Sequence, residues 1–215
     1  MRILRLRSLV LAVLLAVGSS QAGELTRQQA LAALDQPDAA ARLAAVERLA
    51  DIGQMADAAR LQPRLDDDDP RVRVFATGAM WQIWSRSGDA AIDALFARGV
   101  AQMEAGANDD ALATFSEIVV RKPAFAEGWN KRATVYFLLG RNEESLRDCD
   151  EVLARNPIHF GALSGAGQIH LALGHAQQAL DFFRRAVQVN PNLDGPAQMI
   201  PRLERLLRER NRQTT

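Results

Sequence analysis

The chain has 215 residues, enough for one or two domains, and its 26 basic residues are balanced by 26 acidic ones. A balanced charge provides no general attraction to nucleic acid or to an anionic membrane, so composition favours neither kind of partner. Cys149 is the single cysteine, which excludes an internal disulfide and leaves packing to hold the fold.

Residues 1–22 have the pattern of a secretory signal peptide. Three arginines within the first seven residues precede an unbroken apolar run from Leu9 to Val17. Small residues at Ser20 and Ala22 then predict cleavage after Ala22. An uncleaved membrane anchor is the less favoured alternative, because the run is too short to span about 30 Å of hydrocarbon as a helix. The pattern predicts a periplasmic or secreted protein.

Residues 23–89 show helical periodicity and no strand alternation. Glycine and two acidic, proline-containing turns divide the segment into four expected helices. These helices cover residues 25–34, 39–52, 56–65 and 72–85. Asp38 and Asp69 stand where a side chain can accept hydrogen bonds from the first backbone amides of the second and fourth helices.

The two acidic turns belong to an internal repeat. Residues 38–45 align with residues 69–76 at an offset of 31, with Asp, Arg and Ala at equivalent places. This pattern resembles the short HEAT-like repeat, and the resemblance implies two antiparallel helix pairs over residues 23–89. Asp66–Asp69 is interpreted as a solvated capping turn rather than a metal site, because neither the glycine turn nor the distal glutamate of a calcium loop follows.

A period of 34 residues organises residues 90–193. Two residue types keep this period: Gly106, Gly140 and Gly174, and Pro123, Pro157 and Pro191. A fixed period of this size indicates a solenoid, whose units bury their apolar faces by stacking on their neighbours. Each unit divides into two helices. The glycine ends the first in a left-handed conformation, and the proline follows the second.

The residues at fixed places in each unit resemble the tetratricopeptide repeat. The middle unit has Trp129, Ala133 and Tyr136 on its first helix, and the last unit has Ala179 and Phe183 on its second helix. The resemblance implies three units, at about residues 92–125, 126–159 and 160–193.

The middle unit departs from the pattern at Cys149, where the other two units have Phe115 and Phe183. Residues 127–133 and 159–163 also look like a group of exported bacterial tetratricopeptide repeat proteins.

Residues 194–215 are predicted to form a C-terminal capping helix and tail. Ile200, Leu203, Leu206 and Leu207 give the helix one apolar stripe, and arginines cover the rest. The expected fold is therefore all-α: an α-solenoid of antiparallel helix pairs, with a short HEAT-like module, three tetratricopeptide units and a capping helix.

No motif in the chain indicates an enzyme. There is no glycine-rich phosphate loop, no Gly-x-Ser-x-Gly, no Cys-x-x-Cys and no His-Glu-x-x-His. His159, His170 and His175 fall on different parts of the unit, so a shared metal site is not expected. Cys149 occupies a packing position, where a thiol behaves as a small apolar group. We expect no catalytic residue, no cofactor and no metal site.

The tetratricopeptide resemblance implies a concave groove lined by the first helix of each unit, in which an extended peptide can lie. The lining positions are Asp93, Phe96, Val100 and Met103 in the first unit, Glu127, Asn130, Thr134 and Phe137 in the middle unit, and Ser164, Gln168 and Leu171 in the last. The positions lack the combined set of lysine and asparagine side chains that clamps a C-terminal carboxylate in chaperone-binding members, so no such ligand is expected.

These patterns predict a non-enzymatic scaffold of the bacterial cell envelope that binds a protein or peptide partner in the groove. It would be a monomer or a weak oligomer and would bind no nucleic acid. The alternative is an envelope-maintenance factor whose arginine-rich C-terminal helix attaches to a membrane surface or to an acidic partner.

Overall fold

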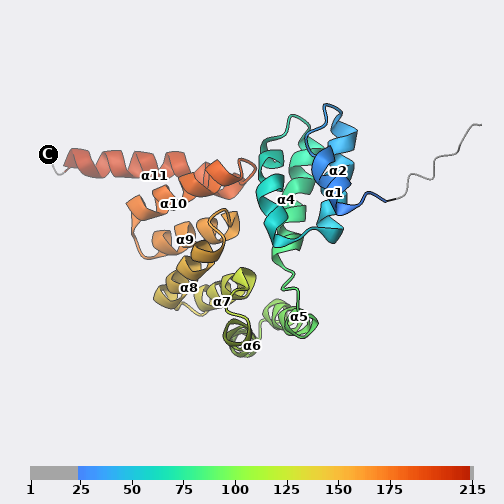
Figure 1. Cartoon of the computed structure of the whole chain (residues 1–215). Helices are drawn as coiled ribbons and strands as arrows, with labels where there is room; N and C mark the ends of the chain where they lie inside the picture. The colour runs from blue at the N-terminus through green and yellow to red at the C-terminus, as the bar shows by residue number, and fades with distance from the viewer. Residues whose placement is uncertain (1–23, 214–215) are drawn as a thin grey trace, which may run out of the picture.

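The computed structural model describes residues 24–213, and within that range the chain is helical with no strand (Figure 1). Consecutive helices pack in pairs, so the predicted all-α solenoid is confirmed. The predicted signal peptide, residues 1–22, lies outside the described residues. None of the described helices combines the length and the apolar character that a membrane crossing requires.

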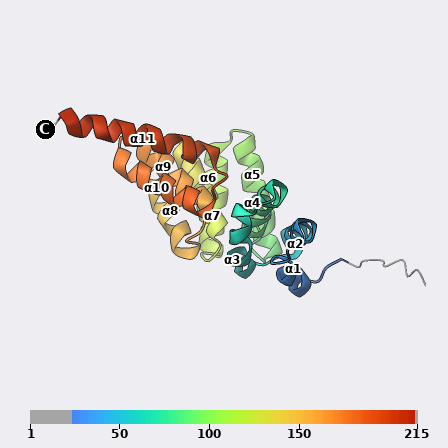
Figure 2. The same cartoon turned by 90° about the horizontal axis from the view of Figure 1, so that it is seen from above.

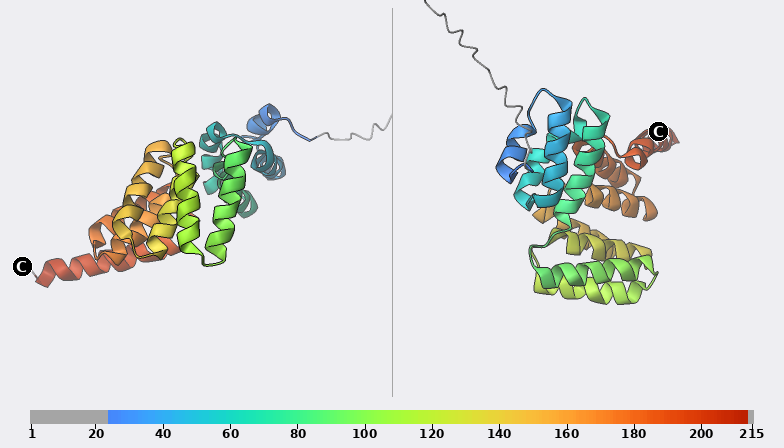
Figure 3. Two further views of the ribbon diagram at one scale, coloured as in Figure 1. Left: turned by 90° about the horizontal axis from the view of Figure 1, so that it is seen from below. Right: turned by 90° about the vertical axis from the view of Figure 1, so that its right-hand side faces the viewer.

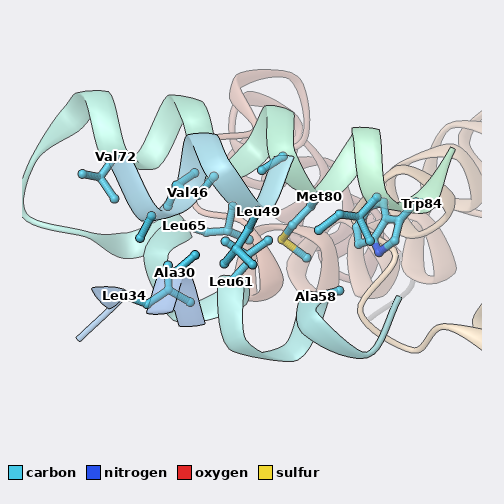
Figure 4. Packing of buried hydrophobic residues seen from close by; sticks show 14 of the residues in the cluster. Ala30, Leu34, Val46, Leu49, Ala58, Leu61, Leu65, Val72, Met80 and Trp84 are labelled. Atoms are coloured by element: carbon cyan, nitrogen blue, oxygen red, sulfur yellow. The ribbon is translucent and has the colours of Figure 1, made fainter. Parts of the chain in front are cut away.

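Residues 24–86 form an N-terminal module around one apolar core (Figure 4). Its longer helices are α1 (Arg27–Ala33), α2 (Ala39–Ile52) and α4 (Pro70–Trp84). α2 packs against both α1 and α4, and the core between them contains fully buried Leu49, Leu61 and Met80. Burial of such side chains contributes about 2 kcal/mol each.

The third expected helix, residues 56–65, is broken into short pieces. They are the 3₁₀ turn η1 (Met55–Asp57), α3 (Ala58–Leu61) and the 3₁₀ turn η2 (Gln62–Asp66). Pro63 lies in the first turn of η2, where its missing N–H prevents α3 from continuing as a regular helix.

The internal repeat of the sequence is visible in the hydrogen bonds of the module. Asp38 caps α2 and Asp69 caps α4 through backbone amides, as predicted. Arg42 and Arg73, each four residues after its cap, donate to the carbonyls five and six residues before themselves. The two halves therefore stabilise the turn before the helix in the same way.

Asp67 differs from the solvated turn that was expected for residues 66–69. Its carboxylate is buried and accepts hydrogen bonds from Arg42 Nε and Nη2 at 2.8 and 2.7 Å. Burial raises the pKa of this carboxyl, but the interactions with Arg42, the Asp69 backbone N–H and Arg64 together outweigh burial and hold the pKa below its ordinary value. Asp67 therefore joins the turn to α2, while Asp69 acts as the cap.

Residues 90–193, the repeat array, form three antiparallel helix pairs. The pairs are α5 (Ala90–Glu104) with α6 (Asn108–Arg121), α7 (Ala126–Leu138) with α8 (Asn142–Arg155), and α9 (Phe160–Ala172) with α10 (Ala176–Val189). Gly106, Gly140 and Gly174 have φ of 72°, 72° and 76°, the left-handed conformation predicted for the turn inside each unit. α11 (Asp194–Gln213) then packs along α10.

The repeat array curves so that its last loop returns to the N-terminal module (Figures 1 and 2). Asn192 Nδ2 donates to the Leu65 carbonyl at 2.6 Å, and Asn190 Nδ2 lies 3.4 Å from Thr77 Oγ1. α5 and α6 lie at the opposite end of the arc (Figure 3). The module and the last repeat are therefore in contact although they are far apart in sequence.

Candidate functional site

A hollow of about 90 Å³ opens between α7, α8 and α9, and we call it the middle-repeat hollow. Its lining residues are Asn130, Ala133, Thr134, Phe137, Ser145, Cys149, Gly161, Gly165, Gln168 and Ile169. Four of these were predicted from the register to line the groove: Asn130, Thr134, Phe137 and Gln168. The structure therefore brings together groove positions from the middle and last units.

In the first and last units the corresponding space is filled by a phenylalanine. Phe115 and Phe183 are fully buried beneath Gly99 and Gly167. A Cβ added at Gly99 would lie 2.7 Å from Phe115 Cζ, and one at Gly167 would lie 2.6 Å from Phe183 Cδ1. Only glycine fits opposite phenylalanine at this position of the repeat.

The middle unit has Ala133 and Cys149 at the same two places, and both line the hollow. Because a cysteine side chain is much smaller than a phenylalanine ring, the exchange leaves space that the single added methyl group of Ala133 does not fill. The departure seen in the sequence at Cys149 thus coincides with the hollow.

The lining of the hollow is uncharged. Burial, and then the nearby Asp148 and Asp150, raise the pKa of the Cys149 thiol to about 12. Ser145 Oγ donates to the Ala133 carbonyl at 2.6 Å, so this hydroxyl already has a partner. The hollow therefore offers mainly apolar contact, with Gln168 as an exposed polar side chain at its edge.

A buried polar cluster lies at the N-terminal ends of α7 and α9. Glu127 and His159 are fully buried, with His159 Nε2 at 2.8 Å from the Glu127 carboxylate. His159 Nδ1 accepts from the Ala162 backbone N–H at 3.1 Å, so the ring proton is on Nε2 and is donated to Glu127. Asn130 Nδ2 donates to both carboxylate oxygens of Glu127 at 3.1 Å, and Lys131 Nζ lies 3.4 Å from Glu127 Oε1.

These partners keep Glu127 ionised. Burial raises the pKa of the carboxyl, but the interactions with His159, Lys131 and Asn130 together outweigh burial and hold the pKa below its ordinary value. With no exposed surface, Glu127 does not lie on the open lining that the register predicted. Asn130 is also largely buried, because its amide is used inside the protein.

α4 of the N-terminal module covers this cluster. The Trp84 ring stacks on His159 with centroids 4.4 Å apart, and Trp81 makes an edge contact with Phe160 at 5.2 Å. Lys131 Nζ lies 5.9 Å from the centroid of the Trp81 ring. Trp84 closes one end of the core of the module (Figure 4). The N-terminal ends of α7 and α9 are therefore covered by the chain itself.

The predicted groove positions on α5 lie outside the hollow. Phe96 is buried against Phe115 and Phe125, with ring centroids 5.9 and 5.4 Å away, so it is a core residue rather than a groove residue. Val100 and Met103 pack against the same core. The remaining predicted positions, Asp93 on α5 and Ser164 and Leu171 on α9, are partly buried and do not line the hollow.

The histidines are arranged differently from the sequence expectation. His170 and His175 lie together, with Nδ1 atoms 3.4 Å apart, while His159 is in the buried cluster. Burial, and then His175, lower the pKa of His170. No group of three or more metal-binding side chains occurs among residues 24–213. Sequence reasoning missed His159, because its position after Pro157 looked like an ordinary turn residue.

The paired helices, the left-handed glycines and the 34-residue register define a helical repeat solenoid. Residues 96–151 and 130–194 match the model of the tetratricopeptide repeat, so this part of the chain consists of tetratricopeptide repeats. A tetratricopeptide repeat-containing protein of Rhizobium etli is 37% identical over 108 residues, which are 50% of this chain and 53% of that protein. The chain thus spans about half the length of this curated relative.

Solved structures share the fold at low sequence identity. The first repeat domain of Spaghetti (RPAP3), bound to an HSP90 peptide, has a TM-score of 0.52 at 22% identity, over 54% of this chain and 92% of that chain. The Sgt2 repeat domain of Aspergillus fumigatus has a TM-score of 0.54 at 20% identity, over 58% of this chain and 83% of that chain. MamA has a TM-score of 0.51 at 17% identity, over 70% of this chain and 82% of that chain.

Proposed function

We propose that this chain is a non-enzymatic protein-binding scaffold that holds a partner segment in the middle-repeat hollow. The observation that carries the proposal is the hollow itself, which joins predicted groove positions of two neighbouring units, among them Phe137 and Gln168. The Spaghetti repeat domain, which shares the fold, has a peptide bound. Tetratricopeptide repeats have this binding role in general, which supports the same role here.

The partner segment does not depend on a free C-terminal carboxylate. Lys131 lies on α7 next to the predicted lining position Asn130, and its ammonium is already paired with the buried carboxylate of Glu127. We expect acidic C-terminal peptides to show no specific binding in fluorescence anisotropy. Micromolar binding that is abolished by Lys131→Glu would contradict this expectation.

The test of the scaffold function uses a blocked hollow. Gly165 lies in α9 and lines the hollow, and a Cβ added there has no atom within 4 Å, so the first carbon of a larger side chain meets open space. Peptides from a random phage-displayed library are selected on the chain from Gly23 onward. Binding of the selected peptides is then compared for the wild type, Gly165→Phe and Gly165→Ala.

Peptides that use the hollow are expected to bind the wild type and Gly165→Ala but not Gly165→Phe. The proposal fails if no peptide is enriched, or if every enriched peptide binds Gly165→Phe as well as it binds the wild type. Cys149→Ala tests thiol chemistry separately: the thiol is buried and remains protonated at neutral pH, so no reaction of the sulfur is expected. Loss of the biological role in Cys149→Ala at normal protein level would instead indicate thiol chemistry.

We place this scaffold in the cell envelope, on the basis of the signal-peptide pattern in residues 1–22. Expression of the full chain in a bacterial host, followed by mass spectrometry of the periplasmic fraction, is expected to show a mature N-terminus at Gly23. An intact N-terminus in the cytoplasmic fraction would contradict the proposal.

A second candidate function rests on α11. Arg202, Arg205 and Arg212 are exposed on this helix, and Leu206 is 44% exposed beside them. A basic surface of this kind can attach to an acidic partner or to lipid headgroups. Flotation with anionic vesicles tests it, since electrostatic attachment is lost as salt rises. Absence of flotation at low salt would exclude a membrane contact of this kind.

A further inference from the structure

The size of the middle-repeat hollow restricts what can enter it. An apolar cavity of about 150 Å³ accommodates a benzene ring, and one water occupies about 30 Å³ in the liquid. The hollow, at about 90 Å³, is smaller than the cavity that holds a ring. It is large enough for the few methyl and methylene groups of a valine or leucine side chain.

The chemistry of the hollow selects against charge. The thiol of Cys149 is protonated, and the Ser145 hydroxyl donates inside the protein. Thr134 Oγ1 likewise donates to the Asn130 carbonyl at 2.9 Å. A charged side chain placed here would lose its hydration without gaining an ionic partner, which is costly. The hollow therefore favours an uncharged, aliphatic group.

Trp81 lies beside Gly161, beyond one end of the hollow, although it is not itself a lining residue. Gly161 lines the hollow, and a Cβ added to it would lie 2.3 Å from Cη2 of the Trp81 indole. Beyond this point α7 and α9 are covered by α4, through the contacts of Trp84 with His159. At the other end lies Phe137, near the C-terminus of α7 and far along the helix from the covered residue Glu127.

We propose that the hollow anchors a single aliphatic side chain of a short partner segment, and that Trp81 limits how far this segment extends on one side. The proposal rests on the proposed scaffold function and specifies the partner class of that same site. Cys149 makes the anchor pocket possible because the phenylalanine of the neighbouring repeats is absent. Trp81, from a different module, acts as a specificity-determining residue.

The chemistry of the anchor is tested on the peptides that are selected by the wild type and rejected by Gly165→Phe. They are expected to share one position with Val, Leu, Ile or Met. Replacing that residue by Ala is expected to weaken binding about tenfold or more, the effect of missing methylenes in an apolar pocket. Phe or Lys at this position is expected to weaken binding to a similar extent. Equal binding of the Phe or Lys peptide would overturn the proposal.

A double variant tests whether the hollow itself receives the side chain. Ala133→Gly with Cys149→Phe recreates the pairing of Gly99 with Phe115, and the new phenylalanine ring on α8 is expected to fill the hollow. This variant is expected to remain folded by circular dichroism and to lose peptide binding at least about tenfold. Unchanged binding by the folded double variant would show that the anchor lies elsewhere.

The limit set by Trp81 is tested with longer peptides. A selected peptide is extended by Gly-Ser units either before or after its anchor, and binding to the wild type is measured by calorimetry. Extension toward Trp81 is expected to weaken binding, whereas extension in the other direction is expected to leave binding unchanged. Trp81→Ala is expected to remove this difference. Equal binding of both extended peptides by the wild type would show that Trp81 does not limit the segment.

The outcomes separate this inference from the scaffold function on which it rests. If no peptide is selected at all, the scaffold function fails as well. If the selected peptides share an aromatic or charged anchor, only this inference is overturned.

Discussion

At the scale of single residues, the pairing of Glu127 with His159 shows how polar groups can occupy the interior of a repeat protein. The carboxylate is fully buried, but it accepts hydrogen bonds from His159 and from Asn130. His159 uses its other ring nitrogen to cap α9. The pair therefore fixes the start of α9 relative to α7, beneath the rings of α4.

Removing His159 should be strongly destabilising. His159→Ala leaves a buried charge with fewer hydrogen bonds, removes the cap of α9 and opens a cavity below Trp84. The expected loss is about 3 kcal/mol of unfolding free energy, measured by urea denaturation. His175→Ala is the matched control, because His175 is exposed and should change stability by less than about 0.5 kcal/mol. Equal effects of the two variants would contradict the role of the cluster.

Stability should also fall in acid. The pKa of Glu127 is held below its ordinary value of 4.5, so the folded chain resists protonation of this carboxyl more than the unfolded chain does. The contribution of ionised Glu127 to the free energy of unfolding is complete above about pH 4.5, and it is lost as the pH falls through the lower pKa of the folded chain. Glu127→Gln should therefore show a flatter decline of melting temperature between neutral pH and acid. An unchanged pH profile in this variant would refute the assignment.

At the scale of helix pairs, the residues at the crossing of the two helices compensate each other in size. Phe115 and Phe183 are matched by glycines on the facing helices, whereas Cys149 faces Ala133. The sequence register names all of these positions. It does not show that the middle combination leaves a hollow, because that depends on how far neighbouring side chains move to fill the space.

The compensation can be measured with a double-mutant cycle. Cys149→Phe alone should destabilise the chain by about 1–3 kcal/mol, because the ring meets the methyl group of Ala133. Adding Ala133→Gly should recover much of this loss, as in the pairing of Gly167 with Phe183. Urea denaturation of the two single variants and the double variant gives the coupling energy. Additive effects would show that the two positions do not face each other.

At the scale of the whole molecule, α4 connects the N-terminal module to the last repeat. Thr77 and Trp81 of α4 contact the last loop and the start of α9, respectively. Periodicity could predict the helices, their caps and the left-handed turns, because these depend on local sequence and on adjacent units. It could not predict the return of the array to α4, because no repeat pattern relates Thr77 to Asn190.

The same limit explains the mixed outcome for the groove. Thr134 and Phe137, which the register predicts on the inward face of α7, line the hollow. Glu127 is on this face as well, but it lies under α4 and is buried. Phe96 is buried for a different reason, since Phe125, in the loop before α7, packs on its ring. Register gives the face of a helix, while exposure depends on what packs against it.

The contact between the module and the array predicts opposite effects for two similar substitutions. Gly165→Ala meets open space in α9 and should stabilise the helix by about 0.5–1 kcal/mol. Gly161→Ala gains the same helix propensity, but its methyl group would collide with Trp81. It should be less stable than Gly165→Ala by at least about 1 kcal/mol in urea denaturation. Equal stabilisation by both would mean that Trp81 does not lie against α9.

The contact that closes the arc also determines the order of events during folding. Asn192 and Asn190 reach partners 127 and 113 residues earlier in the chain, whereas each helix pair forms from neighbouring segments. Short-range contacts form first, since little loop entropy opposes them. A chain synthesised from its N-terminus therefore carries Trp81 and Trp84 without His159 and Phe160 until the start of α9 has been made. Docking of α4 should be the slowest phase of refolding, and the fluorescence of these two indoles should report it.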